Sequence, residues 1–231
     1  MHLSLRYLSL AATGLALARA GPSVTIGAGS LLGTTCSNGA SAFLSIPFGV
    51  PPVGDLRWTS PQAYTQPFPV GGYNATTKGS VCIQFGSEFT EPETQSEDWF
   101  VPILSLRDQS IKADVSLYLD VWVPENVTST SGLPVKIWIY GGGQQGGGIQ
   151  NPMYDGCNLA AHDTLLVSIS YRLGPIGYLT LDGAGIGGNF GIQDLVLGLE
   201  WVQSNIAAFG GDPVRFSEPV LDIAMMLTVI S

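Results

Sequence analysis

Residues 135–148 read Val-Lys-Ile-Trp-Ile-Tyr-Gly-Gly-Gly-Gln-Gln-Gly-Gly-Gly. The first six residues are rich in β-branched and aromatic side chains, which predicts a strand over Val135–Tyr140. The glycine-rich run Gly141–Gly148 follows at once. Glycine has no Cβ, so backbone N–H groups in such a loop can turn toward a ligand. The residues alone leave two interpretations open, a plain flexible loop and a binding loop at the end of a strand.

The segments on either side predict an α/β fold. Leu117–Val123 and Leu165–Tyr171 are apolar runs typical of buried strands. Apolar residues then recur at helical spacing, at Leu195, Leu199, Val202 and Ile206. Asp194 is a candidate cap for that helix, and Gly210–Pro213 would end it. Near-continuous apolar strands combined with a helix indicate a sheet covered on both faces.

Composition excludes several classes of protein. The 231 residues carry 9 Lys+Arg and 18 Asp+Glu, for a net charge of −9. Nonspecific nucleic-acid binding needs a basic face, so we expect no nucleic-acid partner. Apolar residues make up 45% and charged residues 12%, which favours a packed core. The histidines and cysteines do not cluster at metal-ligand spacing, and we expect neither a metal nor a cofactor.

The first twenty residues are typical of a secretory signal peptide. Arg6 precedes the short apolar run Leu8–Leu17, and Ala18-Arg19-Ala20 fits an A-x-A cleavage site. A buried first helix is the alternative. No later apolar run is long enough to span a bilayer, so we expect no membrane span. The sequons at Asn74 and Asn126 agree with a secreted, extracellular glycoprotein.

Two other features have competing interpretations. Gly183–Gly188 matches G-x-G-x-x-G, the pattern of a dinucleotide-binding turn. We disfavour that reading because the predicted helix starts several residues too late and no acidic residue closes a second strand about 20 residues on. His162 precedes a predicted strand, and we expect it to be structural rather than catalytic.

Several blocks in order carry a family resemblance that runs from Ser41 to Glu218. They are Phe43–Trp58, Ser96–Asp98, Leu117–Trp122, Ile139–Gly143, Ser170–Pro175, Gly188–Asp194 and Glu200–Pro213. In this order they resemble the type-B carboxylesterases, which include cholinesterases and fungal extracellular lipases. The resemblance implies the N-terminal part of an α/β-hydrolase fold, with a mixed, mostly parallel sheet, flanking helices and an incomplete domain. It implies that Gly142 and Gly143 are oxyanion-hole donors and that the Gly183 run is a family loop.

The resemblance also implies a reaction, the hydrolysis of carboxylic esters by a Ser-His-Glu/Asp triad through an acyl-enzyme. The nucleophile of this family lies in a G-x-S-x-G turn, and the sequence contains none. Gly39–Phe43 is nearest and lacks the second glycine. With no triad residue assigned, we expect the chain to be inactive as written. The alternative is a non-catalytic binding or adhesion member of the same fold.

The chain departs from the family pattern in two places. Residues 99–116 stand where the family has a single Cys, the expected disulfide partner of Cys82, and a retained in-frame intron would explain them. Residues 219–231 form an off-pattern tail, so we expect a signal peptide over 1–20, a partial esterase domain over 21–218 and this tail. The odd number of cysteines leaves at least one thiol unpaired, and the pairing stays open. We further expect the sheet to stop before the nucleophile strand, leaving an open edge and an insoluble or molten chain.

Overall fold

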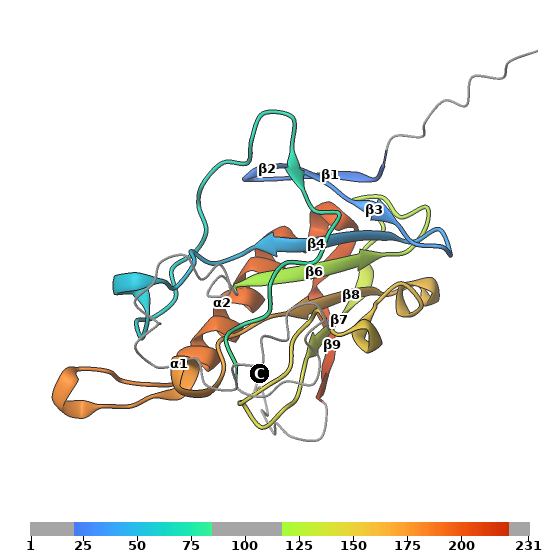
Figure 1. The fold of residues 1–231 in the computed structure, drawn as a ribbon. Coiled ribbons are helices and arrows are strands. Elements are labelled where there is room, and N and C mark those ends of the chain that lie inside the picture. The colour runs from blue at the N-terminus through green and yellow to red at the C-terminus, as the bar shows by residue number, and fades with distance from the viewer. Residues whose placement is uncertain (1–20, 85–116, 222–231) are drawn as a thin grey trace, which may run out of the picture.

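The computed structural model describes residues 21–84 and 117–221 (Figure 1). The predicted signal peptide over residues 1–20 lies outside the described residues, as do the off-pattern insert over 99–116 and the part of the tail from residue 222. These three expectations therefore remain predictions.

Nine strands and seven short or long helices make up the described residues. The strands are β1 (Ser23–Ile26), β2 (Gly29–Leu32), β3 (Thr34–Thr35), β4 (Ser41–Pro47), β5 (Tyr73–Asn74), β6 (Tyr118–Val123), β7 (Leu133–Ile139), β8 (Leu165–Ile169) and β9 (Gly211–Leu221). The α-helices are α1 (Gly174–Tyr178) and α2 (Phe190–Asn205). The 3₁₀ helices are η1 (Gly54–Leu56), η5 (Pro152–Tyr154), η6 (Leu159–His162), η7 (Asp182–Ala184) and η8 (Ile206–Phe209).

The main sheet has the strand order β3-β4-β6-β8-β7-β9, and β1, β2 and β5 form a small second sheet. A mixed sheet of an α/β fold is confirmed, but its described strands are not mostly parallel. The pairs β3–β4, β4–β6 and β6–β8 are antiparallel, whereas β8–β7 and β7–β9 are parallel. Connectivity explains part of this pattern: a short turn joins β3 to β4, which makes that pair antiparallel, whereas crossovers containing η5 and η6, or α2, precede the parallel-paired β8 and β9.

All five residues of β8 are buried because apolar side chains pack against both faces of the sheet. On one face, Leu195 and Val202 of α2 join Val167 and Ile169 in the larger core cluster. Figure 1 shows α2 lying across the back of the sheet. On the other face, Leu166 packs in a second cluster together with side chains of the segment that contains η6. The predicted cover on both faces is therefore confirmed.

Helix α2 matches its predicted apolar stripe but begins earlier than expected. Asn189 precedes it in a left-handed conformation with φ 56°, and its side chain makes no capping hydrogen bond. Asp194 is not the cap, because it lies inside the helix and is fully buried. The chain does leave the helical region at Gly210, whose φ of 88° is a conformation that glycine adopts without strain.

Strand β9 corrects the expectation that the sheet stops before the strand beyond β7. Gly211 pairs with Leu133, and the parallel ladder continues to Leu221 opposite Ile139. The turn at Gly210 explains this, because the N–H of Leu133 donates to its carbonyl at 2.9 Å and brings the chain back beside β7. The predicted open edge of β7 is therefore occupied by residues 211–221, including the start of the off-pattern tail, and the reason for expecting an insoluble or molten chain does not hold at β7.

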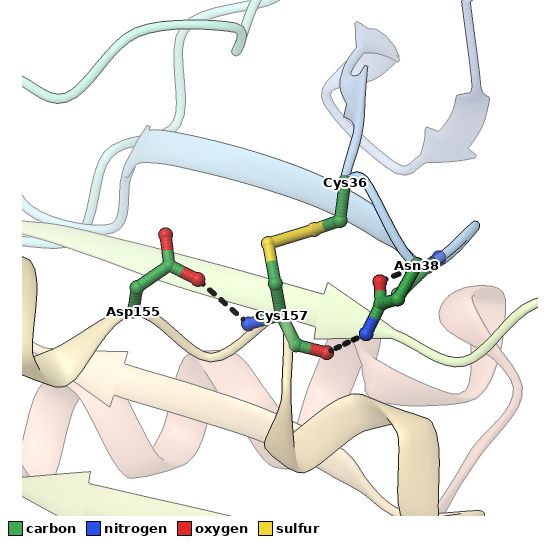
Figure 2. The surroundings of a disulfide bond; sticks show 5 residues. Cys36, Asn38, Asp155 and Cys157 are labelled. Atoms are coloured by element: carbon green, nitrogen blue, oxygen red, sulfur yellow. Dashed lines mark hydrogen bonds between the residues drawn. A yellow bond between two sulfur atoms is a disulfide. The ribbon is translucent and has the colours of Figure 1, made fainter.

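A disulfide joins Cys36 to Cys157 across 121 residues of sequence, with their Cα atoms 5.8 Å apart (Figure 2). It ties the turn between β3 and β4 to the segment just before η6. The amide of Asn38 donates to the Cys157 carbonyl at 2.6 Å, and the Cys157 N–H donates to Asp155 at 2.9 Å. The third cysteine, Cys82, is buried and its thiol donates to the Tyr171 carbonyl at 2.9 Å. The pairing left open by the sequence is thus fixed between the two distant cysteines.

One buried carboxyl, Asp120 of β6, makes stability depend on pH. Its Oδ1 accepts from the Ser45 N–H at 2.7 Å, and within the described residues its Oδ2 has no hydrogen-bond partner. Burial raises the pKa of Asp120 to about 7, Lys78 opposes this rise, and Asp155 adds to it. In the unfolded chain a carboxyl of this type ionises near pH 4, roughly. Folding therefore favours the protonated form, and stability is lost as pH rises from about 4 toward 7.

We predict that Asp120→Asn raises the melting temperature at pH 8 and brings no gain at pH 4. The amide keeps an oxygen for the Ser45 N–H and removes the buried charge. Thermal unfolding followed by circular dichroism at the two pH values measures this, with Asp182→Asn in exposed η7 as the control. An Asp120→Asn effect of equal size at both pH values would contradict the prediction.

Candidate active site

The glycine-rich loop Gly141–Gly148 follows the carboxyl end of β7, which lies between its parallel neighbours β8 and β9. In open α/β sheets, ligands bind outside the carboxyl ends of parallel strands. The loop therefore occupies the end of the sheet where a site is expected. The sequence anticipated both the strand and the loop.

Two tyrosines fix the start of this loop. The rings of Tyr140 and Tyr171 are fully buried and stack with their centres 4.6 Å apart. The Tyr171 hydroxyl donates to the Tyr140 carbonyl at 2.8 Å, and the Tyr140 hydroxyl donates to the Tyr171 carbonyl at 3.2 Å. Burial raises the pKa of both hydroxyls, so both stay protonated donors. The peptide that enters Gly141 is thus held in one orientation.

The loop then folds into a turn that needs glycine. The N–H groups of Gln145 and Gly146 both donate to the Gly142 carbonyl, at 3.1 and 3.3 Å. Gly142 and Gly143 have φ values of 133° and 62°. A Cβ on residue 142 would collide with the carbonyl oxygen of Gly146. Backbone conformation and close approach therefore both exclude a side chain at position 142.

This turn directs the backbone donors outward. In a trans peptide the carbonyl and the following N–H point in opposite directions. Because the Gly142 carbonyl points into the turn, the Gly143 N–H points away from it. Neither the Gly142 nor the Gly143 N–H has an acceptor among the residues that the structure describes, and both glycines are exposed. Two adjacent unpaired N–H donors are suited to a developing negative charge on oxygen.

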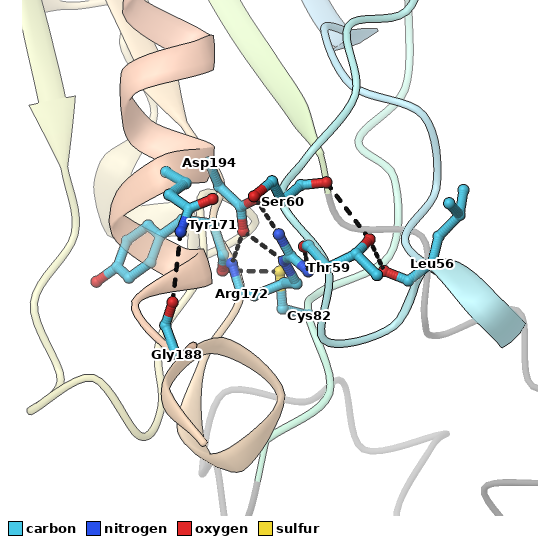
Figure 3. Close-up of polar contacts among 9 residues, drawn as sticks. Leu56, Thr59, Ser60, Cys82, Tyr171, Arg172, Gly188 and Asp194 are labelled. Atoms are coloured by element: carbon cyan, nitrogen blue, oxygen red, sulfur yellow. Dashed lines mark hydrogen bonds and ion pairs between the residues drawn. The ribbon is translucent and has the colours of Figure 1, made fainter. Parts of the chain in front are cut away.

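A buried ion pair holds the neighbouring strand end in place (Figure 3). Arg172 donates to Asp194 from its backbone N–H, Nε and Nη2, at 2.9, 2.8 and 2.8 Å. Its Nη1 also donates to the Thr59 carbonyl at 3.0 Å. Burial raises the pKa of Asp194, and the hydrogen bonds from Arg172 oppose that rise. Both carboxylate oxygens are engaged, so this pair is structural and not a proton carrier.

The structure does not bring the remaining candidates to the loop. His162 ends η6, just before the amino end of β8, and Val135 near the start of β7 pairs with Leu165. Seven residues of β7 span on the order of 20 Å and separate this edge from the glycine loop. Ser41, within the nearest approach to a nucleophile motif, pairs with Val123 at the carboxyl end of β6, again at the far edge.

The Gly183–Gly188 run is not a dinucleotide turn, although one reason given from the sequence was wrong. Helix α2 begins at Phe190, directly after the run, and not several residues later. However, α1 stands between β8 and the run, so no strand leads into it. The run forms η7 and an isolated bridge between Leu181 and Ile186, in a hairpin-like excursion from the body (Figure 1).

The described residues meet neither the requirements of a metal centre nor those of a membrane span. Within residues 21–84 and 117–221, no three His, Cys, Asp or Glu side chains gather as a metal site would require. None of the helices in these same ranges is long and apolar enough to cross a bilayer.

Comparison with known proteins places these features in one family. The Carboxylesterase family model matches residues 20–217. The chain is 38% identical over 182 residues to fumonisin B1 esterase of Sphingopyxis macrogoltabida, covering 75% of this chain and 30% of that protein. It is 39% identical to acetylcholinesterase of Gallus gallus over 176 residues, covering 75% and 22%. It is also 39% identical to cholinesterase of Mus musculus over 175 residues, covering 75% and 27%.

A solved structure agrees with these sequence matches. A PNB esterase superposes with a TM-score of 0.66 and 33% identity, covering 84% of this chain and 37% of that chain. The chain therefore spans between 22% and 30% of the length of the three relatives above.

We predict that Gly142→Ala disrupts the turn, because the added Cβ meets the Gly146 carbonyl and φ 133° is strained for alanine. Strain of this kind costs about 1–3 kcal/mol. Thermal unfolding and the amide NMR signals of Gly143, Gly146 and Gly147 measure it. Gly183→Ala is the matched control, since a Cβ there meets nothing. Unshifted loop signals in Gly142→Ala would contradict the prediction.

Proposed function

The chain belongs to the carboxylesterase family, and we propose on that premise that Gly141–Gly148 forms the oxyanion hole of a carboxylic ester hydrolase. Family membership supports ester hydrolysis as the function and carboxylic esters as substrates. One observation carries the assignment of the loop: at the carboxyl end of β7, the adjacent N–H groups of Gly142 and Gly143 have no acceptor among residues 21–84 and 117–221.

In the proposed reaction, a histidine accepts the proton of a serine hydroxyl as the serine oxygen attacks the ester carbonyl carbon, and the carbonyl oxygen becomes negatively charged. The Gly142 and Gly143 N–H groups donate to this oxygen, which lowers the energy of the tetrahedral intermediate. Its collapse expels the alcohol, which takes the proton from the histidine, and leaves an acyl-enzyme, which water then hydrolyses with the same histidine as base. A single donor of this kind is worth about 3–4 kcal/mol in such enzymes.

We also propose that these 231 residues alone do not turn over esters. They contain no G-x-S-x-G, and their two histidines are His2 and His162. His162 lies at the edge of the sheet away from the glycine loop. The chain then supplies the oxyanion donors, while the nucleophile and the base have no counterpart near them among the described residues.

The purified chain tests both halves of this proposal. We predict that its hydrolysis of p-nitrophenyl butyrate equals that of a heat-denatured control. Isopropyl methylphosphonate, an inert tetrahedral monoanion, mimics the intermediate and should shift the amide NMR signals of Gly142 and Gly143 at millimolar concentration. The Gly183 amide is the internal control.

The two readouts fail separately. Turnover that a serine-directed organophosphate abolishes would refute the inactivity of the chain. Signals of Gly142 and Gly143 that do not move with phosphonate, while the fold remains intact, would refute the oxyanion assignment.

We propose further that the protein is secreted and carries N-linked sugar at two sites. Asn74 is exposed, and its Oδ1 accepts from the Thr76 N–H at 3.2 Å and from the Thr76 hydroxyl at 2.7 Å. Asn126 is exposed in the turn after β6, with φ 63°. Both side chains are therefore accessible to a glycosyltransferase.

When the chain is expressed in a eukaryotic secretory host, we predict that it appears in the culture medium. Treatment with an N-glycanase should then lower its mass by two sugar units. Asn74→Gln and Asn126→Gln should each remove one unit. Thr76→Ser, which keeps a hydroxyl in the sequon, is the control and should retain both. Secretion without any mass change, or retention of the protein inside the cell, would count against the proposal.

A further inference from the structure

The side chain of Gln84 is hydrogen-bonded to the glycine loop, which lies far from it in the sequence. Its side-chain Oε1 accepts from the Gly147 N–H at 2.7 Å, and its Nε2 donates to the Gly147 carbonyl at 2.9 Å. The amide side chain thus pairs with one residue's backbone as a neighbouring strand would. The two residues are 63 positions apart, so this is a tertiary contact and not a local turn.

The peptide between Gly146 and Gly147 connects the Gln84 hydrogen bonds to the proposed oxyanion donors. Because the Gly147 N–H points to Gln84, the Gly146 carbonyl points the opposite way. That carbonyl lies against Gly142, at the place where a Cβ would stand. The N–H of Gly146 also donates to the Gly142 carbonyl at 3.3 Å. Both the N–H and the carbonyl of Gly146 therefore contact Gly142.

Gln84 is itself anchored to the scaffold that holds the other end of the loop. Its Nε2 donates to the Cys82 carbonyl at 3.2 Å. The Cys82 thiol donates to the carbonyl of Tyr171, whose hydroxyl holds the Tyr140 carbonyl. Figure 3 shows Cys82 beside Tyr171 and Arg172. Tyr171 holds the start of the glycine turn and Gln84 holds its other side, and both residues are hydrogen-bonded to Cys82.

We propose that Gln84 is a positioning residue of the oxyanion loop: it fixes the Gly146–Gly147 peptide, and through it the direction of the Gly143 N–H. The proposal rests on the function proposed above for this loop. Glycine loses more conformational freedom on ordering than any other residue, so a run of glycines needs an external constraint. Oxyanion donors help catalysis only when they are oriented before the charge develops. Glutamine supplies the donor and the acceptor that one backbone unit requires.

The test compares three variants of the whole chain. Gln84→Leu removes both hydrogen bonds at similar volume, and Gln84→Glu keeps the acceptor for Gly147 while losing the donor. Gln150→Leu is the matched control, because Gln150 also bonds across to the Ser80 carbonyl at 2.9 Å but makes no hydrogen bond to Gly147 within the described residues. The readouts are amide hydrogen exchange by NMR at Gly143, Gly146 and Gly147, and the phosphonate-induced shift at Gly143.

Gln84→Leu should speed exchange at Gly147 by about tenfold, the loss of roughly one hydrogen bond, and raise it at Gly146. The Gly143 signal should move and its phosphonate shift should shrink. Gln84→Glu should retain Gly147 protection but place a charge that also weakens phosphonate binding. Gln150→Leu should leave all three amides as in the parent chain.

Two results overturn the proposal: unchanged Gly146 and Gly147 exchange in Gln84→Leu, or an equal change in Gln150→Leu. A parent chain that ignores phosphonate refutes the oxyanion function, and the exchange rates then still decide whether Gln84 orients the Gly143 peptide.

Discussion

The placement of α2, the end of β8 and the loop at Thr59 depends on one interaction, the buried ion pair of Arg172 and Asp194. Three hydrogen bonds join the two residues, and a fourth joins Arg172 to the Thr59 carbonyl. These bonds connect the end of β8, the first turns of α2 and a loop more than a hundred residues earlier. Removing one partner of such a pair leaves an uncompensated buried charge and costs about 3–5 kcal/mol. The position of α2 across the sheet is therefore set by polar geometry as well as by apolar packing.

The tyrosine pair next to this ion pair carries the constraint to the glycine loop. Tyr171 directly precedes Arg172, so fixing the arginine backbone also fixes the tyrosine. Its hydroxyl then holds the Tyr140 carbonyl, at the point where β7 ends and the glycines begin. Six of the eight residues of this loop are glycines, which have no side chain to anchor them by packing. Its conformation is consequently held by residues from elsewhere, including Tyr171 on one side, Gln84 on the other, and the Gly174 N–H, which donates to the Gln144 carbonyl at 2.6 Å.

Local sequence patterns were sufficient for the strands and for the loop, and insufficient for the contacts that position them. The strands β6, β7 and β8 are short apolar runs with β-branched and aromatic residues, a signal that depends only on neighbours in sequence. Asp194 was misread as a cap, because a carboxylate near a helix start looks the same whether it bonds its own backbone or a distant arginine. Strand β9 was missed because its pairing with β7 depends on the turn at Gly210.

The grip of Gln84 on Gly147 and the disulfide of Cys36 with Cys157 left no local signal either. The family resemblance did not supply them either. It implied a disulfide partner for Cys82, but it implied no partner for Gln84, Cys36 or Cys157. Contacts between side chains far apart in sequence are fixed only when the whole sheet is assembled. Local sequence patterns therefore predict the chemical groups of the loop better than the distant contacts that hold those groups in place.

The groups that hold the glycine loop are neutral, and this matters for the role proposed for it. The Tyr140 and Tyr171 hydroxyls stay protonated because burial raises their pKa values, and the Gln84 amide does not titrate. The charge of Arg172 is neutralised by Asp194 and does not need an incoming anion. A fixed negative charge beside the loop would oppose a developing oxyanion, and a fixed unpaired positive charge would hold an anion permanently. Oriented dipoles do neither, so a loop held by neutral hydrogen bonds can favour a transient negative oxygen and release the product afterwards.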